Sequence, residues 1–528
     1  MNRGKANFTF SQVPSVVRPR SVFDKSRTYK TTFDAGYLIP FFWEEILPGD
    51  TCTLSVTSFA RLATLICPFM DNLWMDFHFF YVPHRLEWVN WQRFCGEQDN
   101  PDDSTDFLVP QVTVDVTPGS LYDYFGLPCA TNGHTVTVDS LLFRAYNLIW
   151  NEFYRDENLQ NSVNVPVDDG PDDPADFVLL RRGKRKSDPF TSALPWPQKG
   201  PGVELPIGTT APVTGGTFDV SWTKDAGSTS NPMYYAKLDG TSSPFTSSTI
   251  ASGTRLGAHV TVPDLVADLS SATAITINSL REAFQIQKWY EQLARGGSRY
   301  VELVLSMFGC HTGDARLQRP EYLGGGSTPI QVHAVAQTSS TDAVSPQANL
   351  SAFAVSGQSG IGFTKSFVEH GHVLGLVSVR GDYTYQQGLD RMWTRQTKFD
   401  FYWPAFAHLG EVPVLNQELY HIPPSHPLAS KNTQAFGYQE RWYEYRYGIS
   451  KVTGKLRSGL SDSLDVWHLA QFFSQLPTLN STFIEENPPV NRVIAVQNEP
   501  QFIFDSVIKC RMARVMPVYS VPGLVDHF

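Results

Sequence analysis

The stretch from Leu73 to Gly96, LWMDFHFFYVPHRLEWVNWQRFCG, constrains most strongly how this chain can fold. In its first half, every second residue points to the same side of the chain, which predicts a strand. Met75, Phe77, Phe79 and Tyr81 form the face of this strand that lies in a hydrophobic core. Phe80 and Val82 make the opposite face partly apolar, so we expect both faces to be covered. Proline has no N–H to donate, and Pro83 therefore ends the strand. Beyond it, the spacing of apolar residues over 86–94 predicts a short helix closed by Gly96.

Similar alternation elsewhere predicts an all-β chain with a few short helices. Strand candidates lie at 37–42, 51–59, 112–116, 300–307, 330–335, 363–368, 372–379, 440–447 and 502–515. Helical spacing with capping residues marks 140–153, 278–296 and 463–473. A Gly/Ser loop between strands is expected at 358–360, and a glycine turn at 324–326. No repeat of 20 to 50 residues is present, which argues against solenoids and propellers.

Composition favours a chain that buries much of its surface. Only 18% of the 528 residues are charged, whereas 13% are aromatic, which suits a core together with permanent contacts between copies. The net charge of −10 argues against a surface that is basic throughout, so any contact with nucleic acid must be local. The six cysteines contain no CxxC pair, and we expect buried, reduced thiols rather than disulfides or a zinc site.

The N-terminus carries charges but no apolar segment typical of a signal peptide. No apolar run is long enough to cross a bilayer, so we expect a soluble chain made in a reducing cytoplasm. Residues 1–32 are basic and show no periodicity, which predicts an extended arm. A frayed terminus without a role is the alternative. The residues of this arm that could meet a nucleic acid are Arg3, Lys5, Arg18 and Arg20.

A second charged segment separates its acids from its bases. The acidic part, 168–176, lacks the ligand spacing of an EF-hand, and a solvated turn is the better interpretation. The basic part consists of Arg181, Arg182, Lys184, Arg185 and Lys186. Two interpretations stay open for it: contact with DNA phosphates, or neutralisation by the nearby aspartates or by a neighbouring subunit.

The composition changes after a linker rich in proline and glycine at 192–208. Residues 209–257 are rich in Thr, Ser and Gly and poor in large aliphatic residues, and they are too many for an ordinary loop. We expect a small β-rich insertion that protrudes from the main core. Its aromatic residues Trp222, Tyr234 and Tyr235 are candidates for contact with another surface.

Motifs for catalysis or cofactors are mostly lacking. The GQSGIG segment fits neither a nucleophile elbow nor a dinucleotide fingerprint. His370 and His372 offer two imidazoles to a metal, but no third ligand stands at a diagnostic spacing. Alternating Tyr and Arg over 441–447 resemble a base-stacking platform, yet glutamates on the other face favour cross-strand packing. We therefore predict no enzyme, no catalytic residues, no metal and no cofactor.

Several long blocks resemble the major capsid proteins of small single-stranded DNA bacteriophages of the gokushovirus group, in the microvirus family. The blocks occur in the expected order and include CPFMDNLWMDFHFFYVPHRLEWVNWQRFCG, ALPWPQKGP, LREAFQIQKWYEQLARGGSRYVE, DARLQRPEYLGG, FGYQERWYEYRYG and LDVWHLAQFF. The resemblance implies an eight-stranded antiparallel jelly-roll β-sandwich with long inserted loops. It divides the chain into an arm (1–32), a first part of the jelly roll (33–208), a protrusion (209–257) and a second part (258–528).

The resemblance also implies a function. Such proteins form an icosahedral shell, the simplest with one chain per asymmetric unit (T=1), around a circular single-stranded DNA genome. One inserted loop forms a protrusion where three subunits meet, and it contacts the host. Expected partners are copies of the chain, the genome, a small basic packaging protein, a minor capsid or pilot protein, and a host receptor. The expected location is the virion, assembled in the bacterial cytoplasm. A carbohydrate-binding or carbohydrate-active β-sandwich is the alternative.

Overall fold

The computed structural model describes residues 20–129, 135–183, 187–203, 213–214, 219–224, 234–237, 256–259, 266–267, 277–295, 302, 306, 318–338, 341, 347 and 349–519. The chain divides into two units. One combines Met1–Pro197 with Ala294–Phe528, and the other is Gln198–Leu293. Among the described residues, no helix is both long and apolar enough to cross a membrane.

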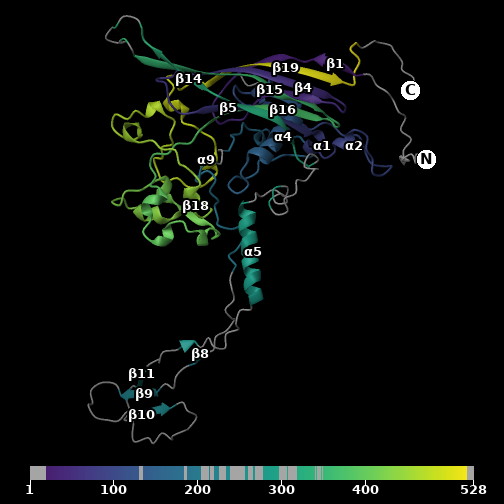
Figure 1. The fold of residues 1–528 in the computed structure, drawn as a ribbon. Coiled ribbons are helices and arrows are strands. Elements are labelled where there is room, and N and C mark those ends of the chain that lie inside the picture. The colour runs from purple at the N-terminus through teal and green to yellow at the C-terminus, as the bar shows by residue number, and fades with distance from the viewer. Residues whose placement is uncertain are drawn as a thin grey trace, which may run out of the picture. The chain divides into compact units, whose positions relative to one another are not determined.

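A six-stranded antiparallel sheet forms one layer of the larger unit (Figure 1). Its strands in spatial order are β1 (Ser21–Asp24), β19 (Phe502–Arg514), β4 (Thr51–Leu62), β15 (Leu350–Ser366) and β14 (Gln331–Ala336), while β2 (Arg27–Phe33) also pairs with β19. The alternation of β19 buries Phe502, Phe504 and Ile508 on one face. The other face is open to solvent, as expected for an antiparallel sheet that packs on one side only.

A second antiparallel sheet packs against the buried face of the first. Its order is β13 (Glu321–Pro329), β5 (Leu73–Pro83), β16 (Gly371–Gly381) and β3 (Ile39–Ile46). Met75, Phe77 and Phe79 of β5 share one core with Phe504 of β19. The rings of Phe77 and Phe504 lie 6.2 Å apart. The structure thus confirms an all-β organisation built of antiparallel sheets, with β5 as a central strand that ends at Pro83.

The opposite face of β5 is covered too, as predicted. Phe80 and Val82 belong to a second core with residues of α4 (Leu141–Ile149), which continues as a π-helix, η1 (Trp150–Tyr154). Figure 1 shows α4 on the side of β16 away from the six-stranded sheet. The same layer holds α1 (His84–Glu87), α2 (Trp91–Phe94), α3 (Leu121–Tyr124) and the strand pair β6 (Gln111–Asp115) and β7 (Thr135–Asp139).

Short elements after residue 383 surround a third core. This core contains Phe190, Tyr385, Phe436 and Tyr443. The elements in this region are η4 (Arg391–Thr394), η5 (Lys398–Asp400), η6 (Pro404–Phe406), β17 (Val412–Leu415), α8 (Asn416–Leu419), η7 (Ala429–Thr433), β18 (Ala435–Gln439), η8 (Tyr443–Tyr445), η9 (Gly454–Leu456), η10 (Asp465–Trp467), α9 (Ser481–Ile484) and η11 (Val490–Arg492). Upstream of them lies η2 (Pro174–Asp176).

The unit Gln198–Leu293 has its own small sheets. β9 (Asp219–Lys224) lies between β10 (Tyr234–Lys237) and β11 (Leu256–His259), and β8 (Val213–Thr214) pairs with β12 (Val266–Ala267). Nearly all of helix α5 (Ile277–Arg295) belongs to this unit, and it confirms the helix predicted at 278–296. The strand predicted at 300–307 lies outside the described residues except at 302 and 306.

Two predictions in the C-terminal third are wrong. Residues 463–473 form only the single turn η10 instead of a helix, since Leu469 is buried whereas Leu464 and Phe472 are about half exposed. A helix would place all three in one buried stripe. Residues 440–447 do not form a strand, because Trp442 adopts a left-handed conformation (φ 70°) and starts the turn η8. This turn buries Tyr443, whose hydroxyl donates to Glu418.

Glycine-rich segments also differ from expectation. Residues 358–360 lie inside β15, where its pairing with β4 shifts between Gln358 and Ile361. Extra residues opposite a shorter run form a β-bulge, and Gly360 provides the positive φ of 80° there. The predicted turn at 324–326 is part of β13. The helix predicted over 86–94 is instead two separate turns, α1 and α2.

The cysteine prediction holds in part. Cys52, Cys67 and Cys510 are buried free thiols, whereas Cys95 and Cys129 are free but exposed. Cys310 lies outside the described residues.

Candidate functional site

The two described arginines of the basic segment make contacts inside the chain. Arg181 stacks on the ring of Tyr37 at 3.9 Å and donates to the carbonyl oxygen of Glu486 at 3.1 Å. Arg182 donates to the carboxylate of Asp76 at 2.7 Å. The partner of Arg182 is therefore a residue of β5 and not one of the aspartates nearby in sequence. Lys184, Arg185 and Lys186 lie outside the described residues.

Asp76 is the centre of a buried polar network that sequence reasoning missed. Besides Arg182, it accepts from Arg380 on β16 at 2.8 Å and from Ser327 on β13 at 2.6 Å. Burial alone raises the pKa of Asp76, but Arg182, Ser327 and Arg380 together hold it below its ordinary value. The network therefore ties three neighbouring strands to the segment that carries Arg182.

The acidic half of the charged segment has a structural role. The guanidinium of Arg144, on α4, is fully buried and donates to Asp172 at 2.5 and 2.7 Å. Asp169 accepts from the indole of Trp88 at 2.7 Å. These aspartates thus fix the segment against the helical layer.

Of the arm residues predicted to meet a nucleic acid, Arg20 is the one within the described part of the chain. The later part of the predicted arm is not a free extension, because it forms β1 and β2. Arg20 lies just before β1 and donates to the hydroxyl of Thr51 at 2.8 Å and to the carbonyl oxygen of Ala513 at 3.2 Å. Arg3, Lys5 and Arg18 lie outside the described residues. Because β1 is paired with β19, Arg20 marks where the arm joins the six-stranded sheet.

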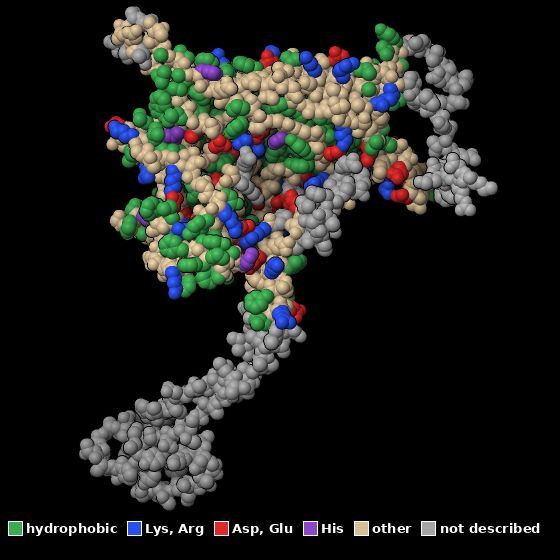
Figure 2. All heavy atoms as spheres, in the orientation of Figure 1, with side chains coloured by type: hydrophobic (Ala, Val, Ile, Leu, Met, Phe, Trp, Pro, Cys, Tyr) green, Lys and Arg blue, Asp and Glu red, His purple; other side chains and the backbone are tan. Residues whose placement is uncertain are grey.

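The solvent face of the six-stranded sheet, which we call the open face, is basic and aromatic. Outward positions of β4 and β19 place Arg61 opposite Ile503, Ser55 opposite Lys509, and Thr53 opposite Arg511. Exposed residues of the open face are Lys30, Phe59, Arg61, His333, Phe353, Ile503, Val507, Lys509 and Arg511. Figure 2 shows Lys and Arg side chains along this upper side of the molecule, with a few acidic ones between them.

Acidic residues reduce the charge of the open face only in part. Asp505 pairs with Lys30 at 2.9 Å, but the two side chains remain 45% and 68% exposed. The ring of His333 stacks on Phe353, with centroids 5.2 Å apart. Period-two alternation in β19 could have revealed this surface, because its inward positions are apolar and two of its outward positions are cationic.

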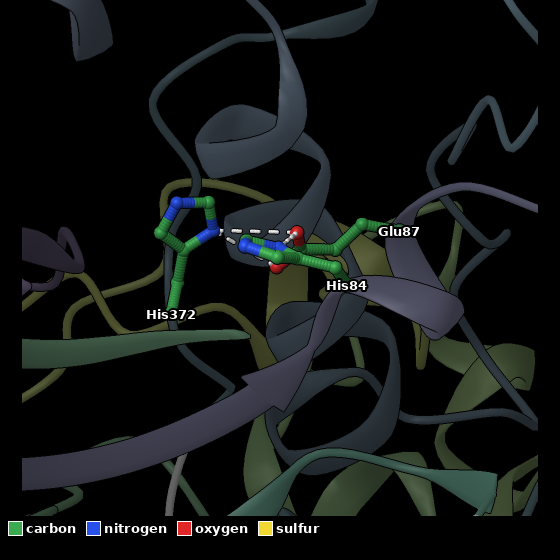
Figure 3. Close-up of side chains that lie close together, drawn as sticks. All are labelled: His84, Glu87 and His372. Atoms are coloured by element: carbon green, nitrogen blue, oxygen red, sulfur yellow. Dashed lines mark hydrogen bonds and ion pairs between the residues drawn. The ribbon is translucent and has the colours of Figure 1, made fainter. Parts of the chain in front are cut away.

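The described strands of the insertion bring its candidate aromatic positions together. Trp222 on β9 pairs in register with Tyr234 on β10, and Tyr235 pairs with Ser221. Elsewhere, the side chain of His372 on β16 lies beside those of His84 and Glu87, although both are far from it in the sequence (Figure 3).

Another exposed surface, in the C-terminal region, is aromatic. Side chains between η4 and η6 are about half exposed or more, namely Met392, Trp393, Phe399, Phe401, Tyr402 and Trp403. Their neighbour Tyr445 is also half exposed, and its ring lies 6.1 Å from that of Tyr402. We call this set the aromatic surface. Exposed apolar patches of this kind usually mark contacts with other proteins.

Comparison with known proteins gives one family throughout. The phage family "Capsid protein (F protein)" matches residues 11–524. "Capsid protein VP1" of Bdellovibrio phage phiMH2K is 46% identical over 534 residues, which span 98% of each chain. "Capsid protein VP1" of Chlamydia phage 1 is 46% identical over 591 residues, which span 98% of this chain and 97% of the relative.

A more distant relative extends the match. "Capsid protein VP1" of Spiroplasma virus 4 is 36% identical over 541 residues, which span 96% of this chain and 95% of the relative. These matches leave no support for the carbohydrate-binding alternative. The chain belongs to the phage capsid protein (F protein) family: it is a major capsid protein, a structural component of the virion and not an enzyme.

Proposed function

We propose that this capsid protein is an eight-stranded jelly roll that assembles into a T=1 icosahedral shell around single-stranded DNA. The strand order supports the jelly roll, since β2, β19, β4 and β15 form one sheet and β3, β16, β5 and β13 form the other. In this arrangement the last of the eight strands, β19, lies between the first, β2, and the third, β4, as a jelly roll requires. The observation that carries the function is the match to capsid relatives over nearly the whole chain.

Contacts between copies would bury the aromatic surface. Trp393 is 69% exposed and Trp403 is 52% exposed, although large aromatic residues are favoured in the buried centre of permanent interfaces. Trp393→Asp should therefore leave a folded chain that no longer forms shells, as seen by electron microscopy and by particle size. Lys455→Gln, an exposed change in the C-terminal region outside the aromatic surface, serves as the control. Normal shells from Trp393→Asp would remove this surface from the proposed interface.

The open face is the surface that we assign to the genome. It combines cations, which bind phosphates, with exposed rings, on which unpaired bases stack. The basic arm with Arg3, Lys5 and Arg18 leads into this sheet at Arg20, and we assign these three residues to the same role. Lys184, Arg185 and Lys186 remain candidates for the same role. Arg181 and Arg182 already have internal partners, which makes them weaker candidates.

A salt titration tests the genome contact. We expect Arg61→Gln, Lys509→Gln and Arg511→Gln together to leave the sheet folded, since all three side chains are exposed. The particles should retain less DNA, and the loss should grow with salt because each lost phosphate contact reduces binding. The control combines Lys398→Gln, Lys455→Gln and Arg457→Gln, which are exposed residues of the C-terminal region. Equal DNA retention in both triple variants would refute the assignment.

For the insertion, we propose the host-contacting protrusion at the three-fold axis, with Trp222, Tyr234 and Tyr235 as contact residues. Its support is that residues 209–257 fall inside a unit separate from the two main sheets. Loop-closure entropy rises slowly with length, so a short Gly/Ser linker in place of 209–257 should still allow shells to form. These shells should fail to adsorb to host cells. Normal adsorption would refute the receptor role, and a failure to assemble would show that the insertion holds the trimer contact.

The remaining proposed partners are a small basic packaging protein and a minor capsid or pilot protein. Their support is the family relationship alone.

A further inference from the structure

Three side chains from two separate parts of the chain meet inside the larger unit. His84 and Glu87 are the first and last residues of α1, directly after β5. His372 is the second residue of β16, and it pairs in register with Val82. The backbone N–H of His84 donates to the carbonyl oxygen of His370 at 3.1 Å, which holds α1 against β16.

The donor atoms of these side chains converge. Nδ1 of His84 lies 2.7 Å from Oε2 of Glu87, and Nδ1 of His372 lies 3.2 and 3.3 Å from the two carboxylate oxygens. One ligand atom of each residue falls within 4.8 Å of the others. Figure 3 shows the carboxylate of Glu87 beside the His84 ring and joined by dashed contacts to His372, and the centroids of the two imidazole rings are 4.5 Å apart.

The site is largely buried. The side chains of His84 and Glu87 are 3% and 0% exposed, and that of His372 is 12% exposed. The ring of Trp91 packs on that of His84, with centroids 4.3 Å apart. A buried carboxylate is unstable without a compensating positive charge. Burial lowers the pKa of His372, but the adjacent Glu87 more than offsets this and raises it above its ordinary value, so a proton on His372 is one source of that charge. A cation held by all three groups would supply that charge without protonating either ring.

We propose that His84, Glu87 and His372 form a binding site for a divalent transition-metal ion, best suited to Zn²⁺. Two imidazoles and one carboxylate are an established zinc donor set, with bonds of about 2.0–2.2 Å to each ligand. The 2.7 Å hydrogen bond between His84 and Glu87 then opens by a few tenths of an ångström, since the two atoms bind the ion instead of sharing a proton. Each Nδ1 binds without its proton, and any proton it carries leaves to solvent.

Three protein donors leave a fourth position of a tetrahedral ion for water. The bound ion joins α1 to β16 and thereby fastens the segment that follows β5. The ion is a structural cross-link between the four-stranded sheet and the helical layer.

Metal binding is tested on the purified full-length chain, stripped with a chelator and then dialysed. After addition of Zn²⁺ and removal of excess, we expect about one zinc per chain by mass spectrometry of the metal. With Co²⁺ in its place, we expect the visible absorption of a tetrahedral site, which Zn²⁺ should abolish. The zinc-loaded chain should also melt at a higher temperature than the stripped chain, because the ion binds only the folded form.

Variants separate this site from adventitious binding. His372→Gln and Glu87→Gln should each lower the zinc affinity at least tenfold, roughly the loss expected when a metal site is damaged. His333→Gln, an exposed histidine of β14, is the control and should bind as the wild type does. Circular dichroism verifies that each variant is folded. If Glu87→Gln does not fold, the test rests on His372→Gln, which changes a less buried side chain, and on the cobalt spectrum of the wild type.

Two results would overturn the proposal. One is a wild-type chain that holds no zinc and shows no tetrahedral cobalt bands. The other is equal zinc binding by His372→Gln, His333→Gln and the wild type, because the ion would then lie elsewhere on the chain.

Discussion

Replacement of Asp76 by asparagine tests whether the buried network holds the four-stranded sheet together. Asp76 accepts from Ser327, Arg380 and Arg182 at 2.6, 2.8 and 2.7 Å. The side chains of Asp76, Arg380 and Arg182 are only 7%, 8% and 13% exposed. Asp76→Asn preserves the shape of the side chain and removes the one charge that both guanidiniums share.

The expected cost follows from the charges left behind. Removal of one partner from a buried ion pair usually costs about 3–5 kcal/mol. Asparagine keeps one acceptor oxygen, so we expect a loss near the lower end, about 3 kcal/mol in the free energy of unfolding. The matched control is Asp505→Asn, whose pair with Lys30 is exposed and should contribute less than about 1 kcal/mol.

Urea denaturation of the unassembled chain, followed by tryptophan fluorescence, measures both variants at pH 7. A folded carboxyl with a lowered pKa stabilises the protein fully above its unfolded pKa of about 3.9, and this contribution is lost as the pH falls through the folded value. The gap between wild type and Asp76→Asn should therefore be full at pH 7 and shrink below about pH 4. A gap under about 1 kcal/mol at pH 7, or one that does not shrink in acid, would refute the argument.

Two further predictions concern the core and the thiols. Phe504→Ala should lower the free energy of unfolding by about 3–5 kcal/mol in the same denaturation, because Phe504 is 1% exposed and contacts three other phenyl rings. The control Phe59→Ala, on the open face, should lower it much less. Similar losses in the two variants would contradict this prediction. In the folded, unassembled chain, a maleimide should label the exposed thiols of Cys95 and Cys129. It should not label the buried thiols of Cys52, Cys67 and Cys510, and peptide mass spectrometry distinguishes the sites. Labelling of the buried thiols before unfolding would contradict the packing.

Local sequence patterns predicted those parts of the fold that depend on neighbouring residues. The alternation of 75–81 identified β5, and Pro83 identified its end, because both signals act within one strand. Residues 463–473 gave a wrong prediction, since Leu469 packs into the main core whereas Leu464 and Phe472 stay about half exposed, which one helical stripe would not allow. Tertiary contacts then override a weak local preference.

The candidate sites depend on distant pairs, which no local pattern contains. Arg182 meets Asp76 across 106 positions, and His372 meets Glu87 across 285. The pairing of β5 with β16 and β13 brings Asp76 to Arg380 and Ser327, and it places His372 beside the end of β5 that precedes α1. Arg182 reaches Asp76 from a segment outside these strands, which is held by bridges to Tyr37 and Glu485. The aspartates near Arg182 in sequence were plausible partners on charge alone, yet the tertiary position of the Arg182 segment places it against Asp76.

The position of β19 in its sheet has a consequence during synthesis. This strand is the last described one in the chain, but it lies between β4 and the first strands β1 and β2. The ribosome must add the 440 residues that separate Leu62 from Phe502 before β4 can pair on that side. At roughly 5–20 residues per second, the edge of β4 waits about 20–90 seconds without its partner.

An unpaired strand edge invites pairing with other chains, and capsid chains are made together in large numbers. The delay also makes chain length a condition for folding: a chain that stops before Phe502 cannot close its six-stranded sheet.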